Sequence, residues 1–232
     1  RMFMKGWSEP ATLRFARLEL IRGEWRRYLN TLAGPQEIEP EDPSSTAFTI
    51  SAVNIEENGN REPVPYVTPP GILREIDVGT ANQRRLNEQS LEMAVCGLRD
   101  GDARGAYRNI NFDMRMYKRL RMYVHAEAGP DGTTLEDDDM TCFIRLGNDF
   151  ENNYYEYEIP MKVTPWNTGD EDLIWPAENN IDIEFRKLQN LKIERPSGFP
   201  LFEEYEGMDS EYNARLAVKG NPNLANVVMV MV

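Results

Sequence analysis

Histidine and cysteine are scarce in this chain of 232 residues, which holds one histidine and two cysteines. A Ser-His-Asp or Cys-His device would have to use His125. His125 lies between Tyr123 and Glu127 on the polar face of a predicted strand, so a surface-facing histidine is favoured over a catalytic one. Cys96 and Cys142 show no metal-ligand spacing. A bridge between them stays open, although two buried thiols are favoured.

Long apolar runs and excess positive charge are also missing. No run is long enough for a transmembrane helix, and no signal-peptide pattern is present. The net charge of -13 repels phosphates and anionic lipid, so we expect no nucleic-acid partner and no direct membrane contact. The hydrophobic fraction of 41% is enough for a folded core. The chain starts in mid-pattern at Arg1 and stops inside an apolar strand at Val232, so we expect a fragment of something longer.

The most informative stretch runs from Leu86 to Glu127 and holds two candidate strands, Ser90–Leu98 and Arg119–Glu127. In each of them apolar and polar residues alternate, which is typical of an antiparallel strand with one face on a core. The apolar faces are Leu91, Met93 and Val95 in the first strand, and Leu120, Met122, Val124 and Ala126 in the second. A polar connection joins the two strands and ends in one helical turn, for which Asp113 is a possible N-cap.

Further strands follow from the same alternation. They are predicted at Glu24–Tyr28, Thr46–Ile55, Ile72–Val78, Met140–Leu146, Asn153–Met161, Asn180–Ile183, Tyr212–Lys219 and Ala225–Val232. A tight turn is expected at Gly147–Asp149, and a helix at Glu184–Glu194 with Phe185, Leu188 and Leu191 on one stripe. Ala225–Val232 is apolar on both faces, which indicates a central strand. The fold class is therefore all-β with one or two short helices, an antiparallel β-sandwich of the jelly-roll or galactose-binding-domain type.

A short internal echo bears on the domain organisation. Pro10–Leu20 and Pro222–Val232 both place a proline, a small-residue turn and then a strand. We therefore expect residues 1–32 to be a strand segment that closes a preceding repeat. Residues 33–45, rich in proline and acids, form a linker, and residues 46–232 form the β-sandwich domain.

Two long irregular loops, Glu56–Gly71 and Val163–Pro176, are the candidate contact surfaces for partners. The residues singled out as an interaction surface are Asn58, Arg61, Tyr66, Trp166 and Trp175. The alternative, that both loops pack on the sandwich, has at least equal weight.

Other patterns carry weaker functional hypotheses. The acidic run Glu136–Asp139 could hold a structural Ca²⁺ through oxygen ligands, although it lacks the EF-hand spacing. Carboxylates on one strand face, Glu156 and Glu158, would serve a glycan-active enzyme only if two of them faced each other across a cleft. Exposed Tyr123, Tyr154, Trp166 and Trp175 would make an aromatic platform for sugar rings, as in a carbohydrate-binding module. We assign no catalytic, cofactor or metal residue from these patterns.

Several blocks of sequence resemble one known family. They are NIEENGNREPVPYVTPPGI, LNEQSLEMAVCGLRDGDARGAYRN, DMRMYKRLRMYVHAE, FIRLGNDFENNYYEYEIPMKVTPW, NNIDIEF, LKIER and VKGNPNLANVVMV. In this order they are similar to the gliding-motility cell-surface proteins of the SprA family, called Sov in non-gliding relatives.

The resemblance implies a large outer-membrane protein of the Bacteroidetes that forms the translocon pore of the type IX secretion system. This chain would be one soluble, extramembrane β-sandwich module at the cell surface. Its expected partners are other domains and subunits of the translocon and secreted cargo proteins. The family offers no enzymatic site, so the resemblance implies a structural or protein-interaction role in protein export and gliding motility.

Overall fold

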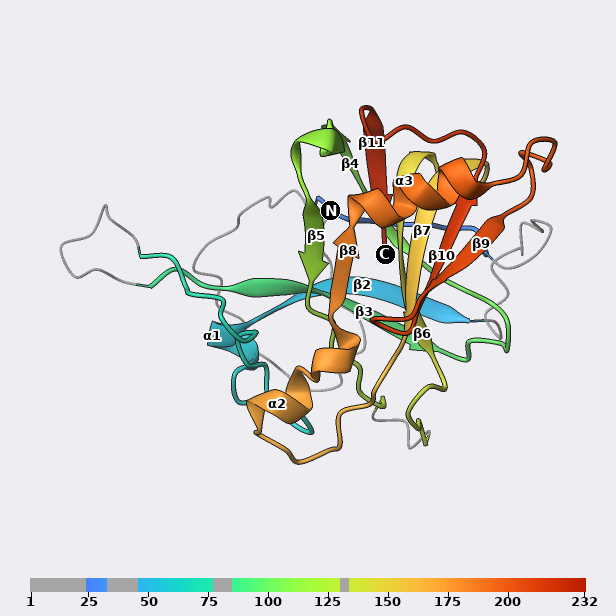
Figure 1. The fold of residues 1–232 in the computed structure, drawn as a ribbon. Helices are drawn as coiled ribbons and strands as arrows, with labels where there is room; N and C mark the ends of the chain where they lie inside the picture. Colours follow the sequence, from blue (N-terminus) through green and yellow to red (C-terminus); the bar gives the residue numbers. More distant parts are fainter. Residues whose placement is uncertain (1–23, 33–45, 77–84, 130–133) are drawn as a thin grey trace, which may run out of the picture.

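The computed structural model describes residues 24–32, 46–76, 85–129 and 134–232. A seven-stranded antiparallel sheet forms its centre, with the strand order β1-β4-β11-β6-β7-β10-β9 (Figure 1). Its strands are β1 Arg26–Arg27, β4 Ala106–Phe112, β6 Thr141–Asp149, β7 Asn153–Pro160, β9 Tyr205–Asp209, β10 Ala214–Lys219 and β11 Val227–Met231.

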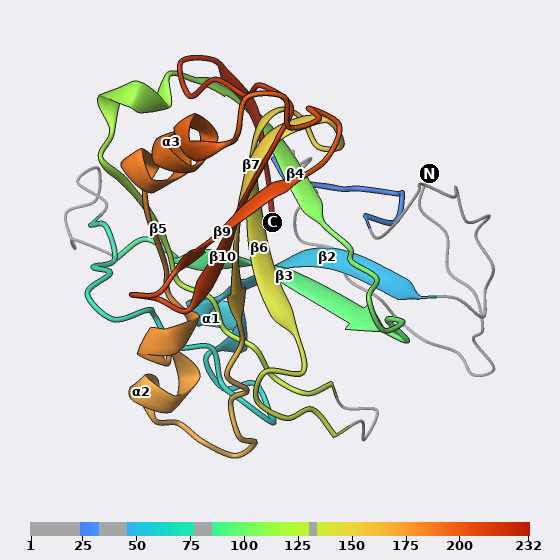
Figure 2. The ribbon, with the colours of Figure 1, turned by 45° about the vertical axis from the view of Figure 1, so that its right-hand side comes forward.

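A thinner second layer covers one face of this sheet. Strand β5 (Arg119–Met122) pairs with β8 (Ile181–Glu184), and helix α3 (Phe185–Glu194) follows β8 directly. Figure 2 shows α3 and the β5–β8 pair on one side of the large sheet. The antiparallel β-sandwich with short helices predicted from the sequence is confirmed, and its two layers are unequal.

The core between the layers follows from period-two alternation. On β7, Tyr155, Tyr157 and Ile159 face the second layer and are buried. The α3 stripe of Phe185 and Leu188 packs against them from the helix side. Burial of each such side chain contributes roughly 1.5–3 kcal/mol. Leu120, Met122 and Val124 contact the same core and Ala126 is buried in it, as the sequence predicts, although regular pairing of β5 ends at Met122.

The opposite face of the sheet carries a buried charge network. On this face Glu156 of β7 accepts hydrogen bonds from Arg145 of β6 and Arg215 of β10. The Arg145 guanidinium lies 4.3 Å from the centre of the Tyr154 ring, and Arg215 also binds Glu158 at 2.6 Å. The sequence pattern pointed to the two glutamates but not to Arg145 and Arg215, which come from the strands on either side of β7.

Strands β2 (Ala47–Asn54) and β3 (Gln89–Cys96) form a separate two-stranded ribbon. The strand predicted at Ser90–Leu98 is present as β3, but the ribbon lies outside the main sandwich, and Met93 and Val95 of the predicted apolar face are exposed. The central position belongs instead to β4, part of the stretch for which the sequence predicts a polar connection. Strand β4 pairs with both β11 and β1, and Met231 of β11, the register partner of Tyr107, is fully buried.

Other local predictions differ from the structure. Gly147–Asp149 is the end of β6 and contains a register shift, and the turn follows at residues 150–152. Of the predicted strand Ile72–Val78, the described part shows only a bridge from Ile76 to Arg85. No disulfide joins the cysteines. Cys96 is exposed at the end of β3, so the expectation of two buried thiols is wrong for it, whereas Cys142 is half-buried against the core.

Helical turns complete the described chain. They are α1 Ile55–Asn58, the 3-10 turns η1 Met114–Met116 and η2 Ala177–Asn179, and α2 Glu171–Ile174. Asp113 caps η1, as predicted, by accepting a hydrogen bond from the backbone N–H of Arg115. Within the described ranges no helix is both long and apolar enough to span a bilayer. Residues 10–20 and 33–45 lie outside the described part, so the division at residues 32 and 45 stays a prediction.

Candidate functional site

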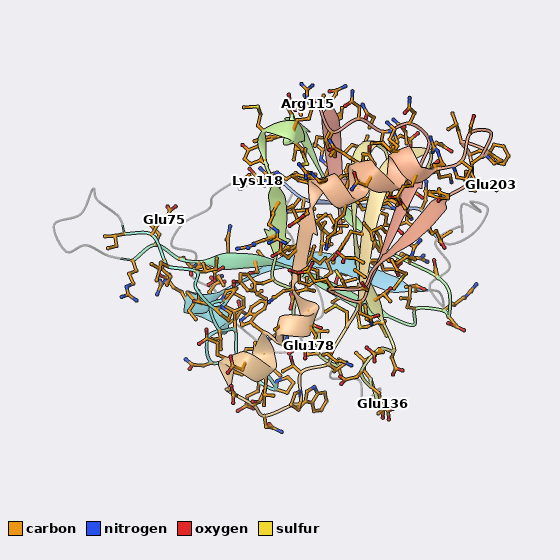
Figure 3. The ribbon with its side chains drawn as sticks, in the orientation of Figure 1. Glu75, Arg115, Lys118, Glu136, Glu178 and Glu203 are labelled. Atoms are coloured by element: carbon orange, nitrogen blue, oxygen red, sulfur yellow. The ribbon has the colours of Figure 1, made fainter. Side chains whose placement is uncertain are left out.

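The two long loops singled out in the sequence meet in space. Residues 58–70, 123–128 and 163–176, called here the loop cluster, come together at the end of the molecule that carries α1 and α2 (Figure 1). Figure 3 places Glu178 and Glu136 toward this end, and Arg115 and Lys118 at the opposite one. The backbone N–H of Asn167 binds the Pro63 carbonyl at 2.9 Å and so joins the loops directly.

The proline-rich loop is ordered by its own first turn. Asn54 caps α1 by accepting from the backbone N–H of Glu57, and its own N–H donates to the Asn58 side chain. The Asn58 carbonyl then accepts from the backbone N–H groups of Arg61, at 3.0 Å, and Tyr66, at 2.9 Å. These bonds replace the regular pairing that the prolines prevent.

A small second core holds the loops together. Val64, Tyr66, Ile174 and Trp175 are buried in it, and Val53, Ile55 and Val67 pack around them. The Trp175 ring meets the rings of Tyr66, Tyr123 and His125 edge-on, at centroid distances of 6.5, 6.3 and 5.8 Å. Because residues of both loops share this core, we infer that neither loop can move without disturbing the other.

Hydrogen bonds fix the aromatic side chains. The Trp175 Nε1 donates to the Val67 carbonyl at 2.9 Å. The Tyr66 hydroxyl donates to Glu88 at 2.5 Å and lies 2.7 Å from Ser90 Oγ. Burial, and then the hydrogen bond to Glu88, raises the pKa of Tyr66 above its ordinary value, so the phenol stays neutral.

A chain of polar groups runs beside the second core. Arg61 binds Glu127 at 2.5 Å and Glu92 at 3.1 Å, and donates to the Val64 carbonyl. Nε2 of His125 lies 3.3 Å from Glu127, so the histidine extends the chain. Arg61 therefore ties the loop to the β2–β3 ribbon and to the segment after β5.

The ring of His125 and the hydroxyl of Thr164 lie within hydrogen-bond distance, but they do not form a catalytic base–nucleophile pair. Nδ1 of His125 lies 3.1 Å from Thr164 Oγ1 and 2.9 Å from the Ile174 carbonyl oxygen. That carbonyl can only accept, so Nδ1 carries the proton and cannot take one from the threonine. Thr164 is also buried, and its hydroxyl donates to Leu173. The half-buried His125 is thus a structural member of the loop cluster, not the surface-facing strand residue that was expected.

All five predicted interaction residues fall in the loop cluster or at its edge. Four of them serve the cluster itself: Asn58 and Arg61 through polar contacts, and Tyr66 and Trp175 through burial. Trp166 differs, because 40% of it is exposed while its Nε1 donates to the Ala128 carbonyl at 3.2 Å. Four of the residues therefore pack within the fold, whereas Trp166 is exposed and available for contact. A binding role stays a prediction.

The aromatic platform for sugar rings is not formed. Tyr154 lies on the outer face of the large sheet, 2% exposed, with its hydroxyl donating to Glu204. Trp175 lies in the loop cluster and is 7% exposed. Because a sugar ring stacks only on an accessible aromatic face, these two side chains cannot share one.

The acidic run Glu136–Asp139 uses its carboxylates locally. Asp139 accepts from the Glu136 N–H, Asp137 accepts from the Val163 N–H, and Asp138 binds Lys162 at 3.1 Å. Within the ranges that the structure describes, no three His, Cys, Asp or Glu side chains converge to hold a metal ion. Glu156 and Glu158 likewise bind arginines on their own sheet face and do not face each other across a cleft.

Comparison with known proteins identifies a family. The whole chain, residues 1–232, matches the family model SprA_N, described as motility related/secretion protein. No curated protein matches the chain at a significant level.

Proposed function

Because the chain belongs to the SprA_N family of motility-related and secretion proteins, we propose that it is a non-catalytic β-sandwich module of an outer-membrane translocon. The translocon is the pore of the type IX secretion system of Bacteroidetes, and the module lies at the cell surface, outside the membrane. There it contacts other domains and subunits of the translocon, or secreted cargo. This proposal rests on the family membership and on the sequence blocks that resemble the SprA and Sov proteins.

The observation that supports an interaction role is the fixed geometry of the loop cluster. Loops of this length are commonly mobile, yet here Trp175 is buried between them and Arg61 anchors them to the ribbon. A preformed surface loses little conformational entropy on binding. The exposed Trp166 on this surface is the residue type that most often dominates an interface.

Trp166→Ala tests the proposal in cells that carry the substitution in the chromosomal gene. We expect the amount of the protein to stay normal, because Trp166 lies outside the buried core, while secreted proteins and gliding decrease several-fold. Phe202→Ala, which truncates another exposed aromatic side chain away from the loop cluster, is the matched control. Normal secretion with Trp166→Ala would contradict a docking role for this surface.

A second variant separates interaction from scaffolding. Trp175→Ala should lower the amount of folded protein, and secretion should fall in proportion. If Trp166→Ala also acts only through the protein amount, the module is a scaffold and the loop cluster is not its contact site. A photo-cross-linking residue in place of Trp166 should yield a defined product with one translocon subunit or cargo protein.

A further inference from the structure

A second candidate contact site lies at the end of the molecule opposite the loop cluster. A pocket of about 170 Å³ opens beside η1, here called the Phe112 pocket. Its lining residues are Phe112, Met114, Tyr117, Arg119, Leu120 and Phe185. A cavity of ~150 Å³ with an apolar lining holds a benzene molecule, so this pocket has room for one leucine or phenylalanine side chain.

A β-bulge lies beside the aromatic wall of the pocket. Val227 of β11 pairs with Phe112 and Met229 pairs with Asn109, so β4 carries one extra residue, and Asn111 adopts a φ of +54°. Phe112 pairs with the buried Val227 and lines the pocket beside Met114, Leu120 and Phe185, which contact the core. At the end of β4, 47% of Phe112 is exposed.

The surface around the pocket is apolar as well. The Phe112 and Tyr117 rings lie 5.6 Å apart, and Met116 at the tip of η1 is 81% exposed. The Met114 N–H donates a hydrogen bond of 2.8 Å to the Leu224 carbonyl, and this bond holds η1 in place. Exposed Met and aromatic residues beside a fitted pocket are typical of a protein-binding site.

The charge of the rim indicates the chemistry of the partner. Lys118 and Arg186 are exposed next to the lining residues, in a chain whose net charge is -13. Arg115 and Arg119 are already engaged, because Asp113 binds Arg115 and Asp182 and Glu184 bind Arg119. An acidic segment would therefore meet cations here and repulsion over the chain as a whole.

From the bulge, the pocket and its rim we propose that the Phe112 pocket binds an acidic protein segment through one apolar anchor side chain. The anchor enters the pocket between Phe112 and Tyr117, and carboxylates on either side bind Lys118 and Arg186. The proposal does not depend on the loop cluster. A protein partner is favoured over anionic lipid because the site is concave and has room for a single protruding side chain.

The test uses the 232-residue chain labelled with ¹³C at its methionine methyl groups. The probes are five eight-residue peptides of glutamate, each with one central Leu, Ile, Met, Phe or Trp, and a sixth with serine there. We expect at least one anchored peptide to shift the Met114 and Met116 signals and leave that of the exposed Met208 in place. The serine peptide should produce at least fivefold weaker binding.

Two variants make the result specific. Phe112→Ala and Lys118→Glu should each weaken binding at least fivefold, whereas the matched controls Phe202→Ala and Arg26→Glu should leave it unchanged. The proposal is overturned if no peptide moves the two signals, or if the pocket and control variants bind alike. It is equally overturned if only phosphatidylglycerol vesicles move Met114 and Met116, which would make the site a lipid contact.

Discussion

The indole Nε1 of Trp175 donates a hydrogen bond to the carbonyl oxygen of Val67, across 108 residues of sequence. This bond and the buried ring join the two long loops in which the sequence predicts no regular secondary structure. The stability of the loop cluster therefore depends strongly on Trp175, and substitutions of this residue can measure that contribution.

Trp175→Phe should lower the free energy of unfolding by about 1–2 kcal/mol, because it keeps an aromatic ring but leaves the Val67 carbonyl without its donor. Trp175→Ala should cost about 3–5 kcal/mol through the cavity that it creates. Urea unfolding followed by circular dichroism measures both values. Trp166→Ala, on the exposed indole, should stay within about 0.5 kcal/mol, and an equal loss for Trp166→Ala and Trp175→Ala would contradict the second core.

Arg145 and Glu156 should show strong energetic coupling. Burial raises the pKa of Glu156 above its ordinary value, and the guanidiniums of Arg145 and Arg215 offset this effect only in part. The buried pair of Arg145 and Glu156 therefore carries a large desolvation cost. Arg145→Met and Glu156→Gln should each cost about 3 kcal/mol, because each removes one charge from a buried network and leaves the opposite charge less well compensated. The double variant should cost less than the sum by about 1 kcal/mol or more. Additive losses in this double-mutant cycle would show that the two groups do not interact.

Cys142 should be inert in the folded chain and Cys96 reactive. Burial raises the pKa of the Cys142 thiol to about 12, whereas Cys96 is exposed at the end of β3. Iodoacetamide at pH 8 should therefore label Cys96 in the native chain and Cys142 only after unfolding. Rapid labelling of Cys142 in the native state would contradict its position against the core.

The raised pKa of Cys142 also predicts that the stability of the fold depends on pH in the alkaline range. The folded-state pKa is raised, so the stability contributed by the neutral thiol is fully present below about pH 9 and is lost as the pH rises toward 12. Between pH 9 and 11 the free energy of unfolding should fall less steeply for Cys142→Ala than for the parent. The difference in slope should be at most about 1.4 kcal/mol per pH unit, as for one proton. Equal slopes would show that the thiol ionises alike in both states.

Gly220→Ala should destabilise the turn after β10 by more than about 2 kcal/mol. Gly220 has a φ of +69°, and an added Cβ would clash with the Asn152 carbonyl oxygen. Gly169 is the control, because it has an ordinary φ and nothing within 4 Å of a Cβ there. Gly169→Ala should be neutral or slightly stabilising in thermal unfolding, and similar losses for the two variants would disprove the close approach.

Local pattern was enough for the elements with a clear period. The alternation of Tyr155, Tyr157 and Ile159 and the helical stripe of Phe185 and Leu188 correctly predicted which faces are buried, because burial repeats with backbone geometry. The resemblance carried by the sequence blocks is confirmed by the family match over the whole chain.

Position within the fold could not be read from the same patterns. The sequence predicts a strand with one face on the core at Ser90–Leu98 and a polar connection over Ala106–Phe112, whereas the structure places the first in an exposed ribbon and the second in the large sheet. Local pattern does not show which strands pair with which. The register shift beside Phe112 and the positive φ of Asn111 likewise depend on the pairing of β4 with β11, which is distant in sequence.

The sequence by itself determined the β class, the family, and which residues of β7 and helix α3 face inward, because these depend on neighbours along the chain. Only the tertiary structure decided that Trp175 is buried and Trp166 exposed, and that Arg145 and Arg215 flank Glu156. These outcomes depend on contacts between residues far apart in sequence, and side-chain type alone does not encode such contacts.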